Sequence, residues 1–395
     1  MEEKSKLWSA EYIEMLCVNI LLFFSFSMVS TSISQLVVSA GYDLAIAGTV
    51  AGIMSIAAMV MRPFSGIMSD KFNRKTLLFA ALIVMTLSTV GYALTTSLVL
   101  LIIFRVLNGV SFSLATTVNM AMAADCIPPK RLGEGLGIFG AGAIASVAIS
   151  PTIGIAIGNA WGDKYIFVFA GALALLGAIV TVTYRNARLP DSAPKEGKAK
   201  LSLNDLFVKE ALIFGLITVV VGSCNGLESG FIRLFGSELG SENIGWYFLI
   251  GSGSMALTQL LGRKLLDKYP FRVLFYPSLA LVVVGFLLLS IANSANMVVV
   301  FIASALAKGI GCGFLQPALQ AACISSTTPE RYGAATCTYY FGNDIGQGTA
   351  PIVGGAIADR SGYQTMFGVY CIPLAAIGVL YAFYRRKKKA VQTAD

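Results

Sequence analysis

Five ionisable side chains stand inside stretches that are otherwise apolar enough to lie in a lipid bilayer. They are Arg62, Arg105, Glu228, Lys308 and Asp344. A charge at the centre of a bilayer costs from about 2.5 to more than 10 kcal/mol unless it faces water or an opposite charge. These residues therefore predict a water-accessible polar cavity inside a membrane protein. In such a cavity carboxylates could carry protons and cations could bind anionic groups.

Lys308 and Asp344 are candidates for a coupled pair. Each lies about 12 residues from one end of its span, which at ~1.5 Å per residue is near the middle of the bilayer. In one interpretation the pair opens when Asp344 takes a proton or Lys308 takes an anionic substrate group. In the other it is a permanent salt bridge between two helices. We expect the first, because a buried ion pair is often no more stabilising than an apolar pair.

Arg105 shares a helix face with two amides, Asn108 and Asn119, because their spacings of three and eleven residues bring them to one side. Two roles are open for this arginine. It could bind substrate or act on a nearby proton-carrying acid, or it could be a structural cation bonded to helix-end carbonyl groups.

Further polar residues recur at helical spacing on the spans that carry Lys308 and Asp344. These rows place Gln316 and Gln347 in the predicted cavity. The rows are Lys308, Cys312, Gln316 and Gln320, and Tyr340, Asp344, Gln347 and Pro351.

Two more cavity candidates come from other spans. Glu228 shares a face with Asn225 and is either a second protonation site or, as we expect, a rim partner for Arg233. Asn19, one turn from Phe23, is the candidate on the first span.

The residue types that most enzymes and metal sites need are missing from this pattern. The chain has no histidine, and its seven cysteines form no CxxC pair, so we expect them to be small apolar core residues. There is also no nucleophile–base arrangement and no phosphate-binding glycine loop. We therefore expect no enzymatic activity, no metal and no other cofactor, with a proton gradient as the driving force and carboxylates as the proton carriers.

Composition sets the environment of these residues. Of the 395 residues 56% are hydrophobic and only 13% charged, against roughly 25% charged in soluble proteins. Apolar runs near ~20 residues predict an all-α membrane protein with twelve transmembrane helices. The predicted spans begin near Tyr12, Asp43, Lys75, Ser97, Leu132, Lys164, Lys209, Asn243, Arg272, Asn296, Tyr332 and Gly362.

The distribution of positive charge predicts the orientation. With the N-terminus inside, most of the 29 Lys and Arg residues fall in inner loops, in the stretch 185–208 and in the tail 385–389, as the positive-inside rule requires. We expect an integral, multi-pass protein of a bacterial-type inner membrane, with both termini cytoplasmic. The basic tail should contact anionic lipid rather than nucleic acid.

An internal repeat predicts the domain organisation. The run PKRLG at 129–133 returns as PERYG at 329–333, and Pro151 with Gly154 returns as Pro351 with Gly354. Repeats of this kind are common in secondary transporters. We expect two pseudo-symmetric six-helix bundles, 1–184 and 209–395, joined by a hydrophilic cytoplasmic linker, 185–208.

The loop between the second and third spans carries a family signature. The run 66–75, GIMSDKFNRK, resembles the G-x-x-x-D-[KR]-x-x-[RK]-[RK] motif of the major facilitator superfamily, and the preceding Arg62-Pro63 also looks like family members. Gly66 should let two helices approach closely. The gating residues that this resemblance implies are Arg62, Gly66, Asp70, Lys71, Arg74 and Lys75.

In that family, the resemblance implies, the Asp of the motif contacts the start of the eleventh helix in the outward-open state and releases it as the halves rock. Here the residues would be Asp70 and Tyr332-Gly333. A degraded copy of the motif in the second half begins at Asp267. Alternatively, the loop's basic residues only fix the topology.

The fifth span resembles the helix-5 pattern of the family's efflux branch, G-x8-G-x3-G-P-x2-G-G. It keeps Gly137, Pro151 and Gly154 but has Ser146 and Ser150 at two glycine positions. Pro151 and Gly154, like Pro351 and Gly354 in the second half, should permit a bend and close helix packing.

Together these patterns predict a secondary transporter that moves a small organic solute by alternating access. We expect proton-coupled efflux of an amphiphilic or zwitterionic compound by a monomer in the bilayer. The alternatives are proton-coupled uptake of a small organic anion, favoured by Arg105 and Lys308, and uncoupled facilitation.

Overall fold

The computed structural model describes residues 7–128, 131–184, 211–241, 244–328 and 331–392. Every regular element in these ranges is helical. The predicted linker, 185–208, lies outside them. The first half contains α1 (Ala10–Ser39), α2 (Leu44–Lys71), α3 (Arg74–Leu94), α4 (Leu98–Cys126), α5 (Leu132–Trp161) and α6 (Lys164–Thr183). The second contains α8 (Leu212–Glu238), α9 (Gly245–Lys268), α10 (Phe271–Ser290), α11 (Met297–Ile324) and α12 (Tyr332–Gln392).

The starts of the helices agree with the twelve predicted spans. α12 is two helices that meet at Gly362, whose φ of 79° lies in the left-handed region that favours glycine. Within the described ranges ten helices are long and apolar enough to cross a membrane, with α12 counted once. α9 is not among them, because it carries polar side chains such as Ser252 and Gln259 and a charged end.

Short polar residues fix where several helices begin. Ser9, Asp43 and Asn73 each accept a hydrogen bond from a backbone N–H in the first turn of α1, α2 and α3. Such caps satisfy donors that have no partner within the helix. Because short turns connect consecutive helices, neighbouring helices run antiparallel.

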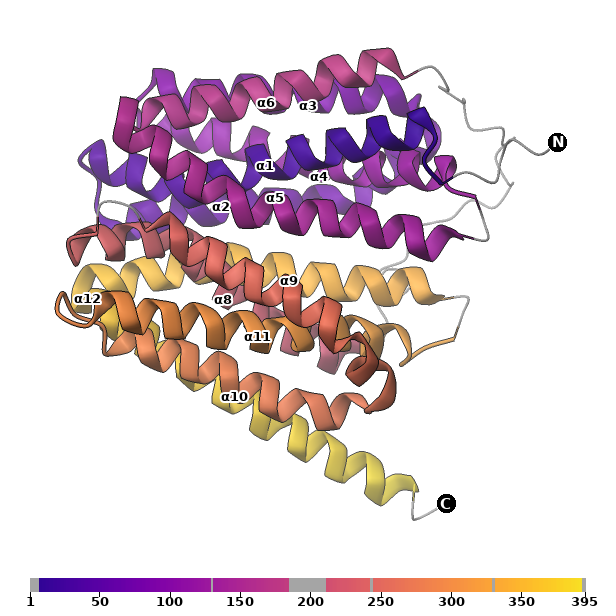
Figure 1. Ribbon diagram of the computed structural model, residues 1–395, viewed down its shortest axis with the longest axis vertical. Coiled ribbons are helices and arrows are strands. Elements are labelled where there is room, and N and C mark those ends of the chain that lie inside the picture. The colour runs from indigo at the N-terminus through magenta and orange to yellow at the C-terminus, as the bar shows by residue number, and fades with distance from the viewer. Residues whose placement is uncertain (1–6, 129–130, 185–210, 242–243, 329–330, 393–395) are drawn as a thin grey trace.

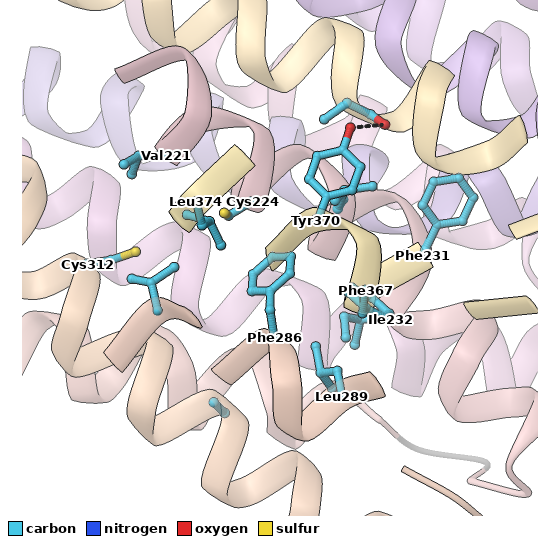
Figure 2. Close-up of a cluster of buried hydrophobic side chains, with 14 of the residues drawn as sticks. Val221, Cys224, Phe231, Ile232, Phe286, Leu289, Cys312, Phe367, Tyr370 and Leu374 are labelled. Carbon is cyan, nitrogen blue, oxygen red and sulfur yellow. Dashed lines mark hydrogen bonds between the residues drawn. The ribbon is translucent and has the colours of Figure 1, made fainter. Parts of the chain in front are cut away.

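The helices form two bundles of six spans. Figure 1 shows α1–α6 together on one side of the molecule and α8–α12 on the other. Each bundle has its own apolar core. In the second bundle Phe231, Phe286 and Phe367 are buried around Tyr370, whose hydroxyl donates to the carbonyl of Ala350 (Figure 2).

The cysteines belong to this packing only in part. Cys224, Cys312 and Cys323 are buried, as small apolar residues should be. Cys17 and Cys337 are exposed, so for these two the prediction of a core position is wrong.

We call the end of the molecule where α6 stops and α8 starts the linker end, and the opposite end the far end. Near the far end the two bundles are in close contact through α2 and the first part of α12. A Cβ on Gly48 would overlap the carbonyl oxygen of Pro351, and one on Gly52 would overlap that of Gly348. Small residues let helix backbones approach in this way.

Gly66, near the linker end of α2, makes no such contact, because a Cβ there would have no atom within 4 Å. The prediction that Gly66 mediates a close helix contact is therefore wrong for this conformation. The close contacts of α2 with α12 lie at Gly48 and Gly52, nearer the far end.

We expect Gly52→Ala to destabilise the protein by about 1–3 kcal/mol, because the new methyl group has to displace backbone atoms of α12. Thermal unfolding of the purified protein measures this. Gly137→Ala is the matched control, because a Cβ at that position meets nothing within 4 Å. Equal melting temperatures for the two variants would contradict the close contact of α2 and α12.

Candidate functional site

A cavity of about 540 Å³ lies between the two bundles, and we call it the central cavity. Side chains from both halves line it. Among the first-half residues are Phe23, Phe26, Ser27, Ser30, Thr31, Met54, Arg105 and Ile144. Among the second-half residues are Asn225, Glu228, Tyr247, Gln259, Lys308, Gln316, Gln320, Tyr340, Asn343 and Gln347.

A buried ion pair stands in the wall of the central cavity. Lys308 Nζ on α11 donates to Glu228 Oε2 on α8 at 2.6 Å. The hydroxyl of Tyr247 on α9 donates to Glu228 Oε1 at 2.9 Å. Because Glu228 is only 5% exposed, both of its carboxylate oxygens form these hydrogen bonds out of contact with bulk water. The pair therefore neutralises two charges that would be costly alone.

These contacts correct two predictions. The expected Lys308–Asp344 pair is wrong, because Lys308 bonds Glu228. The expected rim pair of Glu228 with Arg233 is also wrong, because Arg233 Nη2 donates to Asp163. Glu228 lines the cavity, and its alternative role as a second protonation site stays a prediction.

Asp344 pairs with Arg62 instead. Arg62 Nε donates to Asp344 Oδ2, and Arg62 Nη2 donates to Asp344 Oδ1 at 3.1 Å. The guanidinium also lies 5.7 Å from the ring centroid of Tyr340. Because Arg62 is on α2 and Asp344 on α12, this pair links the two bundles. The sequence counted Arg62 both among the cavity charges and with the gating loop; it lies next to Tyr340, which lines the cavity.

Arg105 lies at the edge of the central cavity and is 2% exposed. Its Nε and Nη2 atoms donate to the carbonyls of Val50 and Ala51 on α2, at 3.0 and 3.1 Å. Its Nη1 atom has no hydrogen-bond partner among the described residues. Two of its nitrogens thus bond carbonyls inside α2 rather than at a helix end, and the choice between the two predicted roles stays a prediction.

Three predicted cavity amides lie away from the cavity. Asn108 donates to Ser88 and Thr89 on α3. Asn19 donates to the Phe139 carbonyl on α5, and Asn119 donates to the Met15 carbonyl on α1. All three are buried and join helices within the first bundle, so their prediction as substrate residues is wrong. The shared helix face was real, but it points into the bundle.

The two sides of the cavity differ in chemistry. Aromatic rings line the cavity from both halves: Phe23 and Phe26 from the first, and Tyr247, Phe248, Tyr339 and Tyr340 from the second. Phe26 stacks on Phe112, behind it, with the ring centroids 4.3 Å apart. The amide side chains of the lining come from the second half and include the predicted Gln316 and Gln347. Tyr247 and Gln259 on α9 were missed by sequence reasoning, although the low hydropathy of that span was a signal for a cavity-facing helix.

The predicted gating loop holds the first bundle together. Arg74 bonds Asp125 at the end of α4 and lies 3.7 Å from Asp70. Lys75 Nζ donates to the carbonyls of Val182 and Tyr184 near the end of α6. Asp70 and Lys71 are exposed. The side chains of Tyr332, Gly333 and Asp267 lie outside the described residues, so the gating contact stays a prediction.

The glycines of the predicted packing motifs do lie in tight contacts. A Cβ on Gly154 would be 2.8 Å from Met28 on α1, and one on Gly354 would overlap Leu227 on α8. Pro151 and Pro351 are buried within α5 and α12. Gly137 differs from these glycines, because a Cβ there would meet no atom within 4 Å.

Two bundles of membrane-spanning helices around a buried polar cavity define a multi-pass membrane transporter. The family model of the Major Facilitator Superfamily matches residues 15–292 and 229–395. The chain belongs to this superfamily. Membership agrees with the resemblance carried by the loop 66–75.

Relatives in the same family include efflux proteins. The chain is 25% identical over 336 residues to the multi-drug resistance efflux pump PmrA of Streptococcus pneumoniae, with 81% of each chain covered. It is 23% identical over 368 residues to the staphylopine export protein of Staphylococcus aureus, with 88% of this chain and 89% of the relative covered.

Solved structures share the fold. The nucleoside transporter NupG has a TM-score of 0.76 at 16% identity, covering 94% of this chain and 99% of that one. A bacterial homolog of the human lysosomal transporter Spinster, in an inward-facing and unoccupied conformation, has a TM-score of 0.80 at 14% identity, covering 97% and 98%. At these identities the likeness concerns the fold alone.

Replacing Lys308 by Met should destabilise the protein by about 3–5 kcal/mol, because Glu228 is then left as an uncompensated buried charge. The double variant Lys308→Met/Glu228→Gln should recover most of that loss. Thermal unfolding of the purified variants compares them.

The control for this pairing is the double variant Lys308→Met/Asp344→Asn, which should show no recovery because Asp344 bonds Arg62. Recovery with the Asp344 substitution and not with the Glu228 substitution would restore the pairing predicted from the sequence.

Proposed function

We propose that this transporter exports a small amphiphilic organic compound in exchange for protons. The observation that carries the proposal is the central cavity, which combines aromatic rings from both halves with amides and one buried ion pair from the second half. The protein would act as a monomer in the bilayer, without a cofactor.

The two walls support an amphiphilic solute. Aromatic rings such as Phe23 and Phe26 gain by covering apolar surface. Amide side chains such as Gln316 and Gln347 donate and accept hydrogen bonds, so they fix a polar group of the solute. A compound that carries both an apolar ring and a hydrogen-bonding or cationic group fits this lining.

Two buried carboxylates support proton coupling. When Glu228 gains a proton it loses its charge, and its attraction to the Lys308 ammonium falls. When Asp344 gains a proton, its charge-assisted bonds to Arg62 weaken. The first change alters the cavity wall, and the second loosens a contact between the bundles. Protonation is thereby tied both to solute binding and to rocking of the halves.

The conformation supports loading from the linker end. The bundles are in close contact near the far end, through Gly48, Gly52 and the Arg233–Asp163 pair. Residues such as Gln320 and Tyr340, near the linker-end parts of α11 and α12, line the cavity. The positive-inside rule assigns the linker end, with both termini, to the cytoplasm of a bacterial-type inner membrane. Export then begins from this state, and the similarity to proteins named as efflux pumps points the same way.

Uptake of an organic anion is the second candidate, and Lys308 in the cavity is the observation that favours it. It ranks second because Lys308 is bonded to Glu228 and two nitrogens of Arg105 are bonded to carbonyls of α2, which leaves only Arg105 Nη1 without a partner among the described residues. Uncoupled facilitation ranks below it, because buried carboxylates are costly to keep without a function.

Proton movement in proteoliposomes distinguishes these candidates. Amphiphilic amines and organic acids that raise the melting temperature of the purified protein are added outside vesicles that contain a pH-sensitive dye. Exchange should raise the internal pH, because a proton leaves as a solute molecule enters. Symport would lower the internal pH, and facilitation would leave it unchanged; either result would overturn the proposal.

Asp344→Asn should abolish the dependence of solute transport on the pH gradient while solute binding is retained, because the amide cannot take up a proton. Solute-driven pH change in the vesicles measures this. Asp125→Asn, a change in an exposed carboxylate that also pairs with an arginine, is the matched control and should behave as the unmodified protein. Unchanged pH dependence in Asp344→Asn would leave that residue a purely structural role.

A further inference from the structure

A row of hydroxyl and amide groups on α1 faces the second bundle. Ser27, Ser30, Thr31, Ser34 and Gln35 recur at spacings of three and four, which brings them to one side of the helix. The first three line the central cavity, and Gln35 lines a second, smaller pocket near the far end. The row therefore connects two cavities.

The opposing helix, α8, carries polar groups over the same distance. Glu228 and Ser229 line the central cavity, and Arg233 lines the smaller pocket. Between them Gly230 lies opposite α1, since a Cβ there would lie in ordinary contact with Ser34 Oγ, at 3.8 Å. α1 and α8 pack directly on each other, so the two polar rows form one seam.

Several groups in this seam have no hydrogen-bond partner among the described residues. They include Ser30 Oγ, Ser34 Oγ, Gln35 Oε1 and Arg233 Nη1. Ser34 is 1% exposed and Arg233 is 8% exposed. Buried polar groups without partners are costly in a closed interface. They gain partners if the two bundles part at the far end and water enters, so the seam is built to be hydrated.

We propose that this α1/α8 seam is the route by which protons reach Glu228 from the far-end side of the membrane. The inference rests on the proposed proton coupling. A hydronium ion in the smaller pocket gives a proton to the nearest water of a chain ordered by Ser34 and Ser30. Each water accepts one proton and donates another, and the last donates to a Glu228 carboxylate oxygen. An O–H bond forms there, and water remains in the pocket.

The groups around the two ends of the route fit this step. Glu228 is faced by the Lys308 ammonium on α11 and the Tyr247 hydroxyl on α9, with the buried thiols of Cys224 and Cys312 nearby. At the far-end mouth the charged groups are Arg233 and Asp163, which bond each other. A neutral mouth does not repel the incoming proton, as an unpaired arginine would.

The first test measures water access to the seam without any transported solute. Cysteines are introduced one at a time into a protein in which the exposed Cys17 and Cys337 are replaced by Ser, and intact cells are treated with a membrane-impermeant thiol reagent. Ser34→Cys should react, because the seam opens to the far-end side. Ser32→Cys should not, because it is equally buried but lies on the opposite face of α1.

Ser237→Cys, exposed at the far end, is the positive control for orientation. If it reacts and Ser34→Cys is as inert as Ser32→Cys, the route is overturned. If Ser237→Cys does not react, the far end does not face the outside and the route is overturned as well.

The second test measures proton movement in the dye-containing vesicles. The double variant Ser30→Ala/Ser34→Ala should exchange solute for protons roughly tenfold more slowly, because two hydrogen-bonding positions that order the water chain are lost. The single variant Ser34→Ala, at a position outside the lining of the central cavity, should also be slower and should leave the solute concentration for half-maximal rate unchanged. Ser34→Thr, which keeps a hydroxyl, should exchange at the unmodified rate.

The matched control is Ser25→Ala/Ser32→Ala, which removes two equally unpartnered hydroxyls from the other face of α1. An equal loss of rate in both double variants would contradict the route. If the unmodified protein moves no protons with any solute, the proposed proton coupling is contradicted. The cysteine-labelling test uses no solute, so its result does not depend on that outcome.

Discussion

The constraint on which this structure depends is that a charge inside a membrane needs a partner. The five ionisable side chains that the sequence placed inside spans are each bonded: Glu228 to Lys308, Asp344 to Arg62, and Arg105 to backbone carbonyls of α2. These three sets of contacts join different parts of the molecule. The first stays within one bundle at the cavity wall, the second links the bundles, and the third fixes two helices of the first bundle.

Because of these differences, charged residues of the same type have different roles. A proton on Glu228 changes the cavity wall that a solute would contact, whereas a proton on Asp344 weakens a contact between the two bundles. Arg105 has no carboxylate partner in the contacts described, so protonation of an acid does not release it directly. The polar seam between α1 and α8 adds a third kind of environment, in which hydroxyls such as Ser34 lack partners as long as the far end is closed.

Much of the fold could be predicted from the sequence because hydropathy and turn residues act locally. The twelve starting points agree with the helices, and even the merged α12 breaks at Gly362, where the last span was expected. The loop 66–75 was enough to indicate the family. The candidate site was predicted less well. Lys308, Glu228, Gln316 and Gln347 do line the cavity, but Asn19, Asn108 and Asn119 bond backbone or hydroxyl groups inside the first bundle.

The sequence by itself determined the spans and which helices carry charge, since these depend on composition and spacing along one segment. It could not determine the partners. Lys308 and Asp344 have matching depths, yet depth leaves open the rotation of each helix and the neighbour that it faces. Arg62 and Asp344 are separated by 282 positions, and Lys308 and Glu228 by 80. Only the packing of the helices decided these pairs, because it alone sets which faces meet across and within the bundles.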